Sequence, residues 1–396
     1  MPATRAIRQT GVSDALPSAA GAAGNFERDV VCLLGLPFDV TTMSAAVEQV
    51  RRCAFEGRRC FISTPNLNFA VAAAKDPSFR DSVLHSDLSL IDGMPLVWIA
   101  RLLGLPIRER VSGAGLFEQI AAHGIPAVDV FFFGGPPGIA ERACARLNDT
   151  ATGARCVGFD SPGFGTLDDM SAEPTIQKIN RSEASFVVVA LGAQKGQAWI
   201  ERNRDRLNAP LICHLGAVVN FVAGSVERAP TPLQRLGLEW LWRIKEQPDL
   251  WRRYWSDGLR LLVWSCTRVL PHTVLTRWRS LMNRQGADAV VSVSHAAQLT
   301  TVKLRGDWTH DRLLPLRQVL TEAAMSDRSL CLDLADVSWV DSAFVGLMLL
   351  ARGVFIGDRE FTLREPTRAV RRIFWFSGAE FLLTRSAPLG ESTGKI

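Results

Sequence analysis

Short apolar runs, separated by helix-length amphipathic segments, occupy the first half of the chain. Each run ends near Gly, Pro or Asp, and continuously apolar strands that alternate with helices are typical of a parallel sheet covered on both faces. We predict strands at residues 31–38, 60–64, 88–92, 128–135, 184–192 and 211–219. The fold class that follows is α/β, with a Rossmann-like parallel sheet.

A second, smaller α/β pattern follows a polar break at 283–288. Strands are predicted at 300–306, 329–334 and 359–365, alternating with helices near 312–325, 342–353 and 366–377. Apolar positions such as Val302, Leu330 and Leu334 predict a small core of its own, so we expect this region to fold alone.

These patterns divide the chain into four parts. We predict a disordered arm rich in Ala, Gly, Ser and Thr (1–27), a sheet domain (28–228), a helical appendage (229–284) and a small α/β domain (288–396).

Composition narrows the class of protein. With 396 residues, 47% of them hydrophobic and 21% charged, the chain has the profile of a globular protein with a substantial core. It contains no apolar run of the roughly 18 residues that span a bilayer, and its N-terminus lacks a signal-peptide core, so we expect a cytoplasmic location. The eight cysteines are scattered without a Cys-x-x-Cys pair, which predicts neither a zinc site nor a disulfide framework.

The appendage concentrates charge and aromatic residues. Residues 229–284 hold six of the eleven tryptophans and a net charge of +6, against +5 for the whole chain. Trp and Arg on amphipathic helices favour contact with a membrane surface or a lipid phosphate. Two alternatives are a Trp-rich helical hairpin packed on the core, and nucleic-acid binding, for which no accompanying motif is present.

One acidic residue stands out at a predicted strand end. Asp92 and Gly93 follow the run 88–91, and the carboxyl ends of parallel strands are where ligands and catalytic groups collect. The alternative is that Asp92 only caps the next helix. The Gly-rich turns at 134–138 and 191–196 suit a nucleotide or nucleotide sugar at the same edge, although neither is a Walker or Rossmann fingerprint.

Seven motifs in order resemble the WecG/TagA/CpsF family of bacterial glycosyltransferases. They are STPNLN (63–68), LIDGMPLVW (90–98), RVSGAGL (110–116), FFFGGPPGIAERA (131–143), ALGAQKGQAWI (190–200), AGSVERAP (223–230) and LGLEWLWR (236–243). The resemblance implies transfer of a sugar from a nucleotide-diphosphate donor to a polyprenyl-diphosphate-linked sugar at the inner membrane face. It implies no cofactor, and without an isolated Asp-x-Asp signature we expect no obligate metal.

The resemblance also assigns roles to residues. Asp92 matches the proposed general base, and Asn66, with Thr64 beside it, matches residues that line the same pocket. Arg252 and Arg253 are the candidates for neutralising the diphosphate leaving group. The chemistry agrees, because an acceptor hydroxyl needs a base and a departing diphosphate needs cations or N–H donors.

Substrate binding is expected from further matched positions. These are Gly93, Arg110, Gly134, Gly135, Gly192, Lys195 and Gln197. The chain departs from the family where Gly-x-Pro-Lys-Gln-Glu is usual, because it reads Gly-Ala-Gln-Lys-Gly-Gln at 192–197. Gly115 also replaces a usual Asp, and Asp249 a frequent Arg. These changes bring donor recognition into question.

The C-terminal stretch 330–353 resembles the STAS domain of anti-sigma-factor antagonists and transporter tails. In regulatory members a Ser after Asp opens a helix and is phosphorylated, and here that position is Ser342, next to Asp341. The alternative is that Ser342 is only the helix N-cap.

Together the resemblances predict a polysaccharide glycosyltransferase with a STAS module for regulation or docking. The partners expected are the donor, the lipid-linked acceptor, the membrane surface and a STAS-binding protein, without nucleic acid; homo-oligomerisation is left open. The rival hypothesis is a noncatalytic scaffold that holds lipid-linked sugar. Because no candidate catalytic residue lies beyond 253, deleting the STAS module is expected to leave the chemistry intact.

Overall fold

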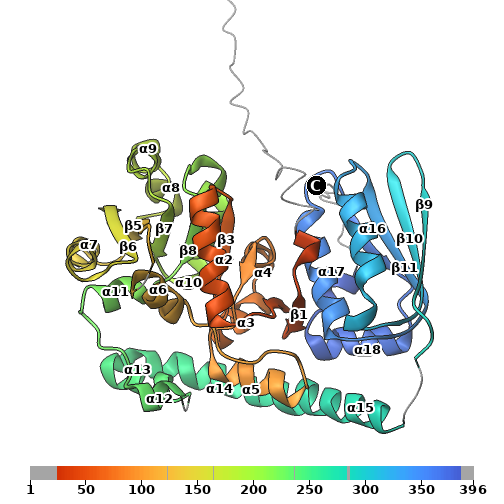
Figure 1. Cartoon of the computed structure of the whole chain (residues 1–396). Helices are drawn as coiled ribbons and strands as arrows, with labels where there is room; N and C mark the ends of the chain where they lie inside the picture. The colour runs from red at the N-terminus through yellow and green to blue at the C-terminus, as the bar shows by residue number, and fades with distance from the viewer. Residues whose placement is uncertain (1–24, 123, 164, 236, 283–285, 385–396) are drawn as a thin grey trace, which may run out of the picture.

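The computed structural model describes residues 25–122, 124–163, 165–235, 237–282 and 286–384 (Figure 1). Residues 1–24 of the predicted arm lie outside this range. Residues 25–27 do not belong to a disordered arm, because Asn25–Glu27 forms a 3-10 turn in which Phe26 is fully buried.

A six-stranded parallel sheet forms the centre of the larger part, as predicted. Its order is β4-β3-β8-β7-β5-β6, and every pairing is parallel. The strands are β3 (Cys60–Ser63), β4 (Leu88–Ser89), β5 (Val128–Gly134), β6 (Ala154–Asp160), β7 (Phe186–Ala190) and β8 (Leu211–His214). The sequence prediction missed β6, an edge strand whose side chains are only partly buried.

Helices cover both faces of the sheet, because alternate residues of each strand point to opposite sides. In β5, Phe132 joins one apolar core, whereas Phe131 and Phe133 join another. The first core is completed by α2 (Met43–Glu56), α6 (Gly113–Ala122), α7 (Ile139–Thr150) and α11 (Val218–Val222). The second is completed by α8 (Leu167–Met170), α9 (Glu173–Arg181) and α10 (Ala193–Asn203).

The first predicted strand, 31–38, does not enter this sheet. It forms a separate antiparallel hairpin of β1 (Val30–Leu33) and β2 (Leu36–Asp39). The two-residue turn at Leu34 and Gly35 has φ values of 51° and 82°, the left-handed pair that a tight hairpin turn requires. The hairpin packs instead on α17 (Ser342–Val354) of the C-terminal region.

The C-terminal region is a four-stranded sheet of order β12-β11-β10-β9 with three helices. Its strands are β9 (Val290–His295), β10 (Leu299–Trp308), β11 (Ser329–Val340) and β12 (Phe361–Arg364), and its helices are α16 (Leu314–Ala324), α17 (Ser342–Val354) and α18 (Arg368–Ser377). The three predicted strands and three predicted helices are present. The structure adds β9, which is antiparallel to β10 and largely exposed.

The C-terminal sheet does not close a core of its own, contrary to expectation. One continuous apolar core joins its helices to the β1–β2 hairpin and to three short helices of the sheet domain. Those helices are α3 (Leu67–Ala73), α4 (Pro77–Leu84) and α5 (Met94–Leu102). Because α17 needs the hairpin to cover its apolar face, the boundary at residue 288 does not separate two independent cores.

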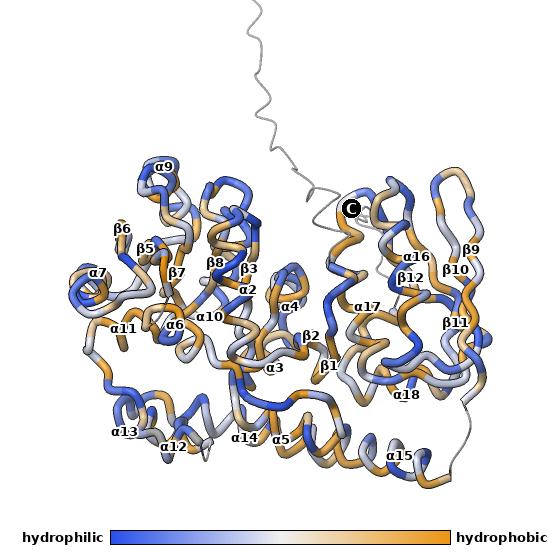
Figure 2. The backbone as a smooth tube through the Cα atoms, viewed as in Figure 1, coloured by the Kyte–Doolittle hydropathy of each residue, from blue (hydrophilic) through white to orange (hydrophobic). Residues whose placement is uncertain are grey.

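The appendage is helical. It contains α12 (Thr231–Arg235), α13 (Glu239–Glu246), α14 (Trp251–Trp264) and α15 (Leu270–Leu281). A π-helical turn at Ser265–Val269 joins α14 to α15 just before Pro271, whose missing N–H interrupts regular helical bonding. Figures 1 and 2 show these helices along the lower edge of the molecule, with apolar positions recurring on α14 and α15.

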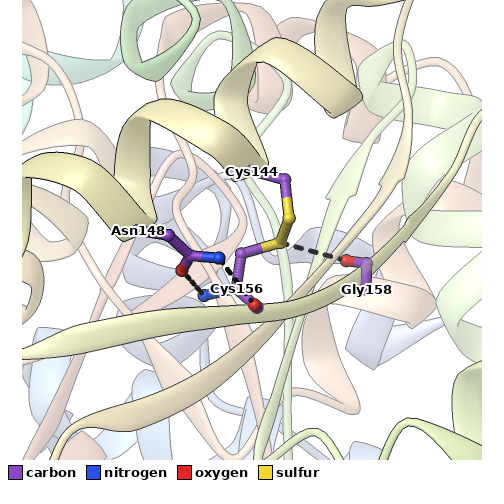
Figure 3. Close-up of a disulfide and its surroundings, with 4 residues drawn as sticks. All are labelled: Cys144, Asn148, Cys156 and Gly158. Atoms are coloured by element: carbon purple, nitrogen blue, oxygen red, sulfur yellow. Dashed lines mark hydrogen bonds between the residues drawn. A yellow bond between two sulfur atoms is a disulfide. The ribbon is translucent and has the colours of Figure 1, made fainter.

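One disulfide corrects the interpretation of the cysteines. Cys144 on α7 and Cys156 on β6 are joined, with their Cα atoms 5.2 Å apart (Figure 3). Asn148 flanks the pair, donating from Nδ2 to the Cys156 carbonyl and accepting the Cys156 N–H at Oδ1. The twelve-residue spacing carried no signal, because a helix and the strand after it can bring any two such positions together.

Candidate active site

A cavity of about 560 Å³ lies at the carboxyl ends of β3, β4 and β8, which are neighbours in the sheet. Residues that follow these strands form its floor, and α13 and α14 of the appendage contribute the opposite wall. This is the edge of the sheet at which the sequence predicted a ligand site. Seven of the thirteen predicted site residues line the cavity: Thr64, Asn66, Asp92, Gly93, Arg110, Gly192 and Arg253.

Asp92 is partly buried in the cavity floor. Its backbone N–H donates to the Pro65 carbonyl over 3.0 Å, and its Oδ2 accepts the Gly113 N–H over 3.2 Å. The helix that follows Asp92 is α5, whose N-cap is Gly93 and has no side-chain cap bond. The alternative that Asp92 caps this next helix is therefore wrong. Its carboxylate contacts the first residue of α6 instead.

Burial raises the pKa of Asp92, and the nearby carboxylate of Glu239 raises it further. The positive charge of Arg110 and the bond from Gly113 oppose this shift without cancelling it. A carboxylate with a raised pKa binds a proton more readily, which suits a group that accepts one from a hydroxyl.

Asn66 and Thr64 lie in the cavity floor beside Asp92. Asn66 is the N-cap of α3, and its Oδ1 accepts the Phe69 N–H over 3.2 Å. Thr64 borders Gly113, where an added Cβ would lie 2.4 Å from Leu215 and 3.1 Å from the Thr64 methyl group. A glycine at 113 thus lets the start of α6 approach close enough for its N–H to reach Asp92.

Basic side chains face Asp92 from the appendage. Arg110 forms an ion pair of 2.9 Å with Glu239 of α13, which links the floor to the opposite wall. Arg243 and Arg253 also line the cavity. Arg252 does not line it; this side chain is exposed, with its guanidinium 5.8 Å from the centre of the Trp251 ring.

The Gly-rich turns contribute less to the cavity than expected. Gly192 lines it at the start of α10, but Gly134, Gly135, Lys195 and Gln197 are not among its lining residues. Lys195 donates to the Gly165 carbonyl, and the buried Gln197 donates to Ser63 Oγ over 3.0 Å. All three departures from this family motif, at 194, 196 and 197, therefore fall outside the cavity wall.

Ser342 lies elsewhere, beneath the β1–β2 hairpin. It is not the N-cap of α17, because Asp341 holds that position and accepts the Phe344 N–H over 3.0 Å. The buried Ser342 hydroxyl donates instead to the Cys32 carbonyl over 2.6 Å. A phosphate on Ser342 would require the hairpin to move.

The structure adds cavity residues that sequence reasoning missed. They include His214, Glu239, Arg243, Tyr254, Asp257, Trp98 and Trp240. His214 bonds the Leu191 carbonyl through Nε2, and burial lowers its pKa, which favours the neutral ring. Asp257 of α14 is buried and accepts from Asn68 over 3.1 Å, and burial raises its pKa. No pattern within the appendage marks Glu239 or Asp257, because their hydrogen-bond partners lie far away in the sequence.

Comparison with known proteins identifies the family of this chain. The family model described as glycosyl transferase WecG/TagA/CpsF matches residues 31–273. The match covers more than half of the chain, which belongs to this family. Residues 291–384 match a STAS domain model of the Mlab type.

Two curated relatives carry the same name, N-acetylglucosaminyldiphosphoundecaprenol N-acetyl-beta-D-mannosaminyltransferase. The protein of Bacillus spizizenii is 27% identical over 202 residues, which are 51% of this chain and 77% of the relative. That of Bacillus subtilis is 26% identical over 196 residues, 49% of this chain and 75% of the relative.

Among the residues that the structure describes, no helix combines the length and the apolar character that a membrane span requires. The same residues contain no group of three or more His, Cys, Asp or Glu side chains placed to hold a metal ion.

Proposed function

We propose that this chain transfers an N-acetylhexosamine from a nucleotide-diphosphate donor to a polyprenyl-diphosphate-linked sugar, in the synthesis of a cell-surface polysaccharide. The observation that carries the proposal is the Asp92 carboxylate, three residues after β4, in a cavity that also presents Arg110, Arg243 and Arg253. The family membership and the names of the two relatives support it, since both relatives are named for transfer to a lipid-diphosphate-linked sugar.

The proposed chemistry assigns one task to the cavity floor and another to the appendage wall. Asp92 takes the proton of the acceptor hydroxyl as that oxygen bonds to the anomeric carbon of the donor sugar, and the bond from this carbon to the diphosphate breaks. Arg243 and Arg253 on the appendage stabilise the negative charge of the departing nucleoside diphosphate. The reaction, so written, needs no metal ion, which remains a prediction.

Membrane association is the second part of the proposal. Seven exposed apolar residues form an apolar stripe at helical spacing on α14 and α15: Trp251, Trp255, Leu259, Leu262, Leu270, Val274 and Leu281, each between 48% and 83% exposed. The neighbouring Arg252, Arg260 and Arg277 are also exposed. An apolar stripe beside cations matches an interfacial helix on anionic lipid, and α14 would then bring the cavity to a lipid-linked acceptor.

Turnover tests the proposal directly. Purified full-length protein is incubated with a panel of nucleotide-diphosphate sugars, N-acetylmannosamine donors included, and a short prenyl-diphosphate-linked N-acetylglucosamine, and nucleoside diphosphate release is measured. We expect release that depends on the acceptor. In Asp92→Asn it should fall by about 10²- to 10⁴-fold, because a positioned base is lost while the acceptor oxygen for Gly113 remains.

A matched control is Asp168→Asn, which alters an exposed aspartate of α8 and should leave turnover unchanged. Near-normal turnover in Asp92→Asn would remove Asp92 from the chemistry. Acceptor binding without release from any donor would favour the noncatalytic scaffold instead.

A further inference from the structure

The STAS module forms hydrogen bonds with the backbone of the β1–β2 hairpin and of the segment that precedes it. Arg317 of α16 donates to the carbonyls of Phe26 and Arg28, each over 2.6 Å, in the segment that enters β1. Ser342 of α17 donates to the Cys32 carbonyl in the middle of β1. At the hairpin turn the Gly35 N–H donates to the Ser377 carbonyl over 2.7 Å.

Glycines allow the two backbones to approach closely. A Cβ on Gly346 of α17 would lie 3.0 Å from the Val30 carbonyl oxygen, and one on Gly35 would lie 2.6 Å from the Gly378 oxygen. On the same face of α17, a Cβ on Gly353 would lie 2.6 Å from the Leu84 carbonyl of α4. The atoms met are backbone, which cannot yield as a flexible side chain would.

The hairpin in turn holds β4. Arg28 and Asp39 form a bidentate ion pair of 2.7 and 3.0 Å, and both side chains are no more than 10% exposed. Asp39 Oδ2 also accepts the Ser89 N–H over 2.6 Å, and Ser89 Oγ donates to the Pro37 carbonyl over 2.7 Å. Arg28 further donates to the Ser86 carbonyl over 2.7 Å.

Ser89 is the last residue of β4, and Asp92 follows three residues later. We propose that the STAS module positions the active site from within the chain: it fixes the hairpin, and the hairpin, with Asp39 as the positioning residue, fixes the strand end that carries Asp92. The module's α17 face is therefore occupied by the chain's own hairpin. The catalytic consequence rests on the proposed function, whereas the mechanical coupling does not.

Amide hydrogen exchange on the full-length protein tests the coupling. Arg317→Ala removes two charge-assisted bonds to the hairpin, so exchange should rise about tenfold or more both in residues 25–39 and in residues 86–92. Residues 128–134 of β5, in the interior of the sheet, should exchange as in the wild type. The matched control is Arg312→Ala, because Arg312 donates to Ala287, outside the hairpin and the six-stranded sheet, and this variant should leave all three segments unchanged.

Each other exchange result would overturn the proposal. Unchanged exchange in residues 25–39 would mean that the module does not hold the hairpin. Faster exchange in residues 25–39 with unchanged exchange in residues 86–92 would mean that the hairpin does not stabilise β4. An equal rise in residues 128–134 would mean that Arg317 supports only global stability.

Turnover provides the second readout. Arg317→Ala should lower kcat about tenfold with KM within twofold of the wild type, because the walls that bind substrate remain while Asp92 is less well held. Normal kcat with residues 86–92 loosened would disprove the catalytic consequence. If the wild type turns over no substrate, the proposed function fails, but the exchange experiment still decides the coupling.

Discussion

The β1–β2 hairpin and the α14–α15 helix both carry several large apolar side chains, yet these side chains end in opposite environments. All eight strand residues of the hairpin are buried against α17 and neighbouring helices, whereas the apolar stripe on α14 and α15 faces outward. Both segments are connected to the same cavity: the hairpin bonds to the strand that leads to Asp92, and α14 forms part of the opposite wall. The difference separates an apolar segment that finds its partner within the chain from one that, we propose, finds it in a lipid surface.

The largest effect is expected from charging the apolar stripe. The double variant Trp255→Glu/Leu262→Glu should lower the partition coefficient on anionic vesicles by at least about a hundredfold, because each large apolar side chain contributes roughly 1.5–3 kcal/mol when buried. Vesicle flotation measures this. The control Ser256→Glu/Thr267→Glu adds the same charge at exposed polar positions of the same helical segment and should lower binding much less. Equal losses in both variants would mean that charge alone, and not the stripe, governs binding.

Replacing one glycine by alanine near each segment should change the free energy of unfolding in opposite directions. Gly346→Ala crowds the hairpin backbone and should lower the free energy of unfolding by about 1–2 kcal/mol, whereas Gly258→Ala meets no atom within 4 Å and should raise it by about 0.5–1 kcal/mol through helix propensity. Denaturant unfolding of both variants measures the difference. Stabilisation by Gly346→Ala would show that the hairpin does not pack tightly on α17.

The smallest effect concerns how α15 is held on the STAS module. His272 is buried and stacks on Phe376 with ring centres 5.5 Å apart, and burial lowers its pKa to about 4. Because the folded pKa lies below the unfolded value, stability is lost as the pH falls from about 6.5 toward 4, by roughly 1 kcal/mol at pH 5.5. His272→Phe should lose less stability between pH 7 and 5.5, whereas the control His295→Phe should behave as the wild type. A wild-type pH dependence in His272→Phe would assign the acid loss to other groups.

Sequence patterns predicted most of the fold because its strands are short, continuously apolar and ended by turn residues. They failed where an apolar run does not reveal which element it packs against. The run 31–38 would look the same in a central strand or in a hairpin, and only the tertiary structure places it against α17. The edge strand β6 was missed for the opposite reason, since its partly exposed side chains lack a continuous apolar run.

The candidate site shows the same limit. Asp92 could be found because a strand end and a turn mark it locally. Glu239 and Asp257 could not, since they meet Arg110 and Asn68 across 129 and 189 residues of sequence. The direction of the Asp92 pKa shift depends on burial and on the long-range neighbours Arg110 and Glu239, so it follows from the fold alone.

The most direct test of the central claim is the dependence of kcat/KM on pH for nucleoside diphosphate release. Asp92 must be ionised to accept a proton, and burial raises its pKa, so activity should fall as the pH drops through a value above the ordinary aspartate pKa of about 3.9. In Asp92→Asn the residual rate should lose this acidic limb. Wild-type activity that stays level down to about pH 4, or an acidic limb that persists in Asp92→Asn, would contradict the assignment of Asp92 as the base.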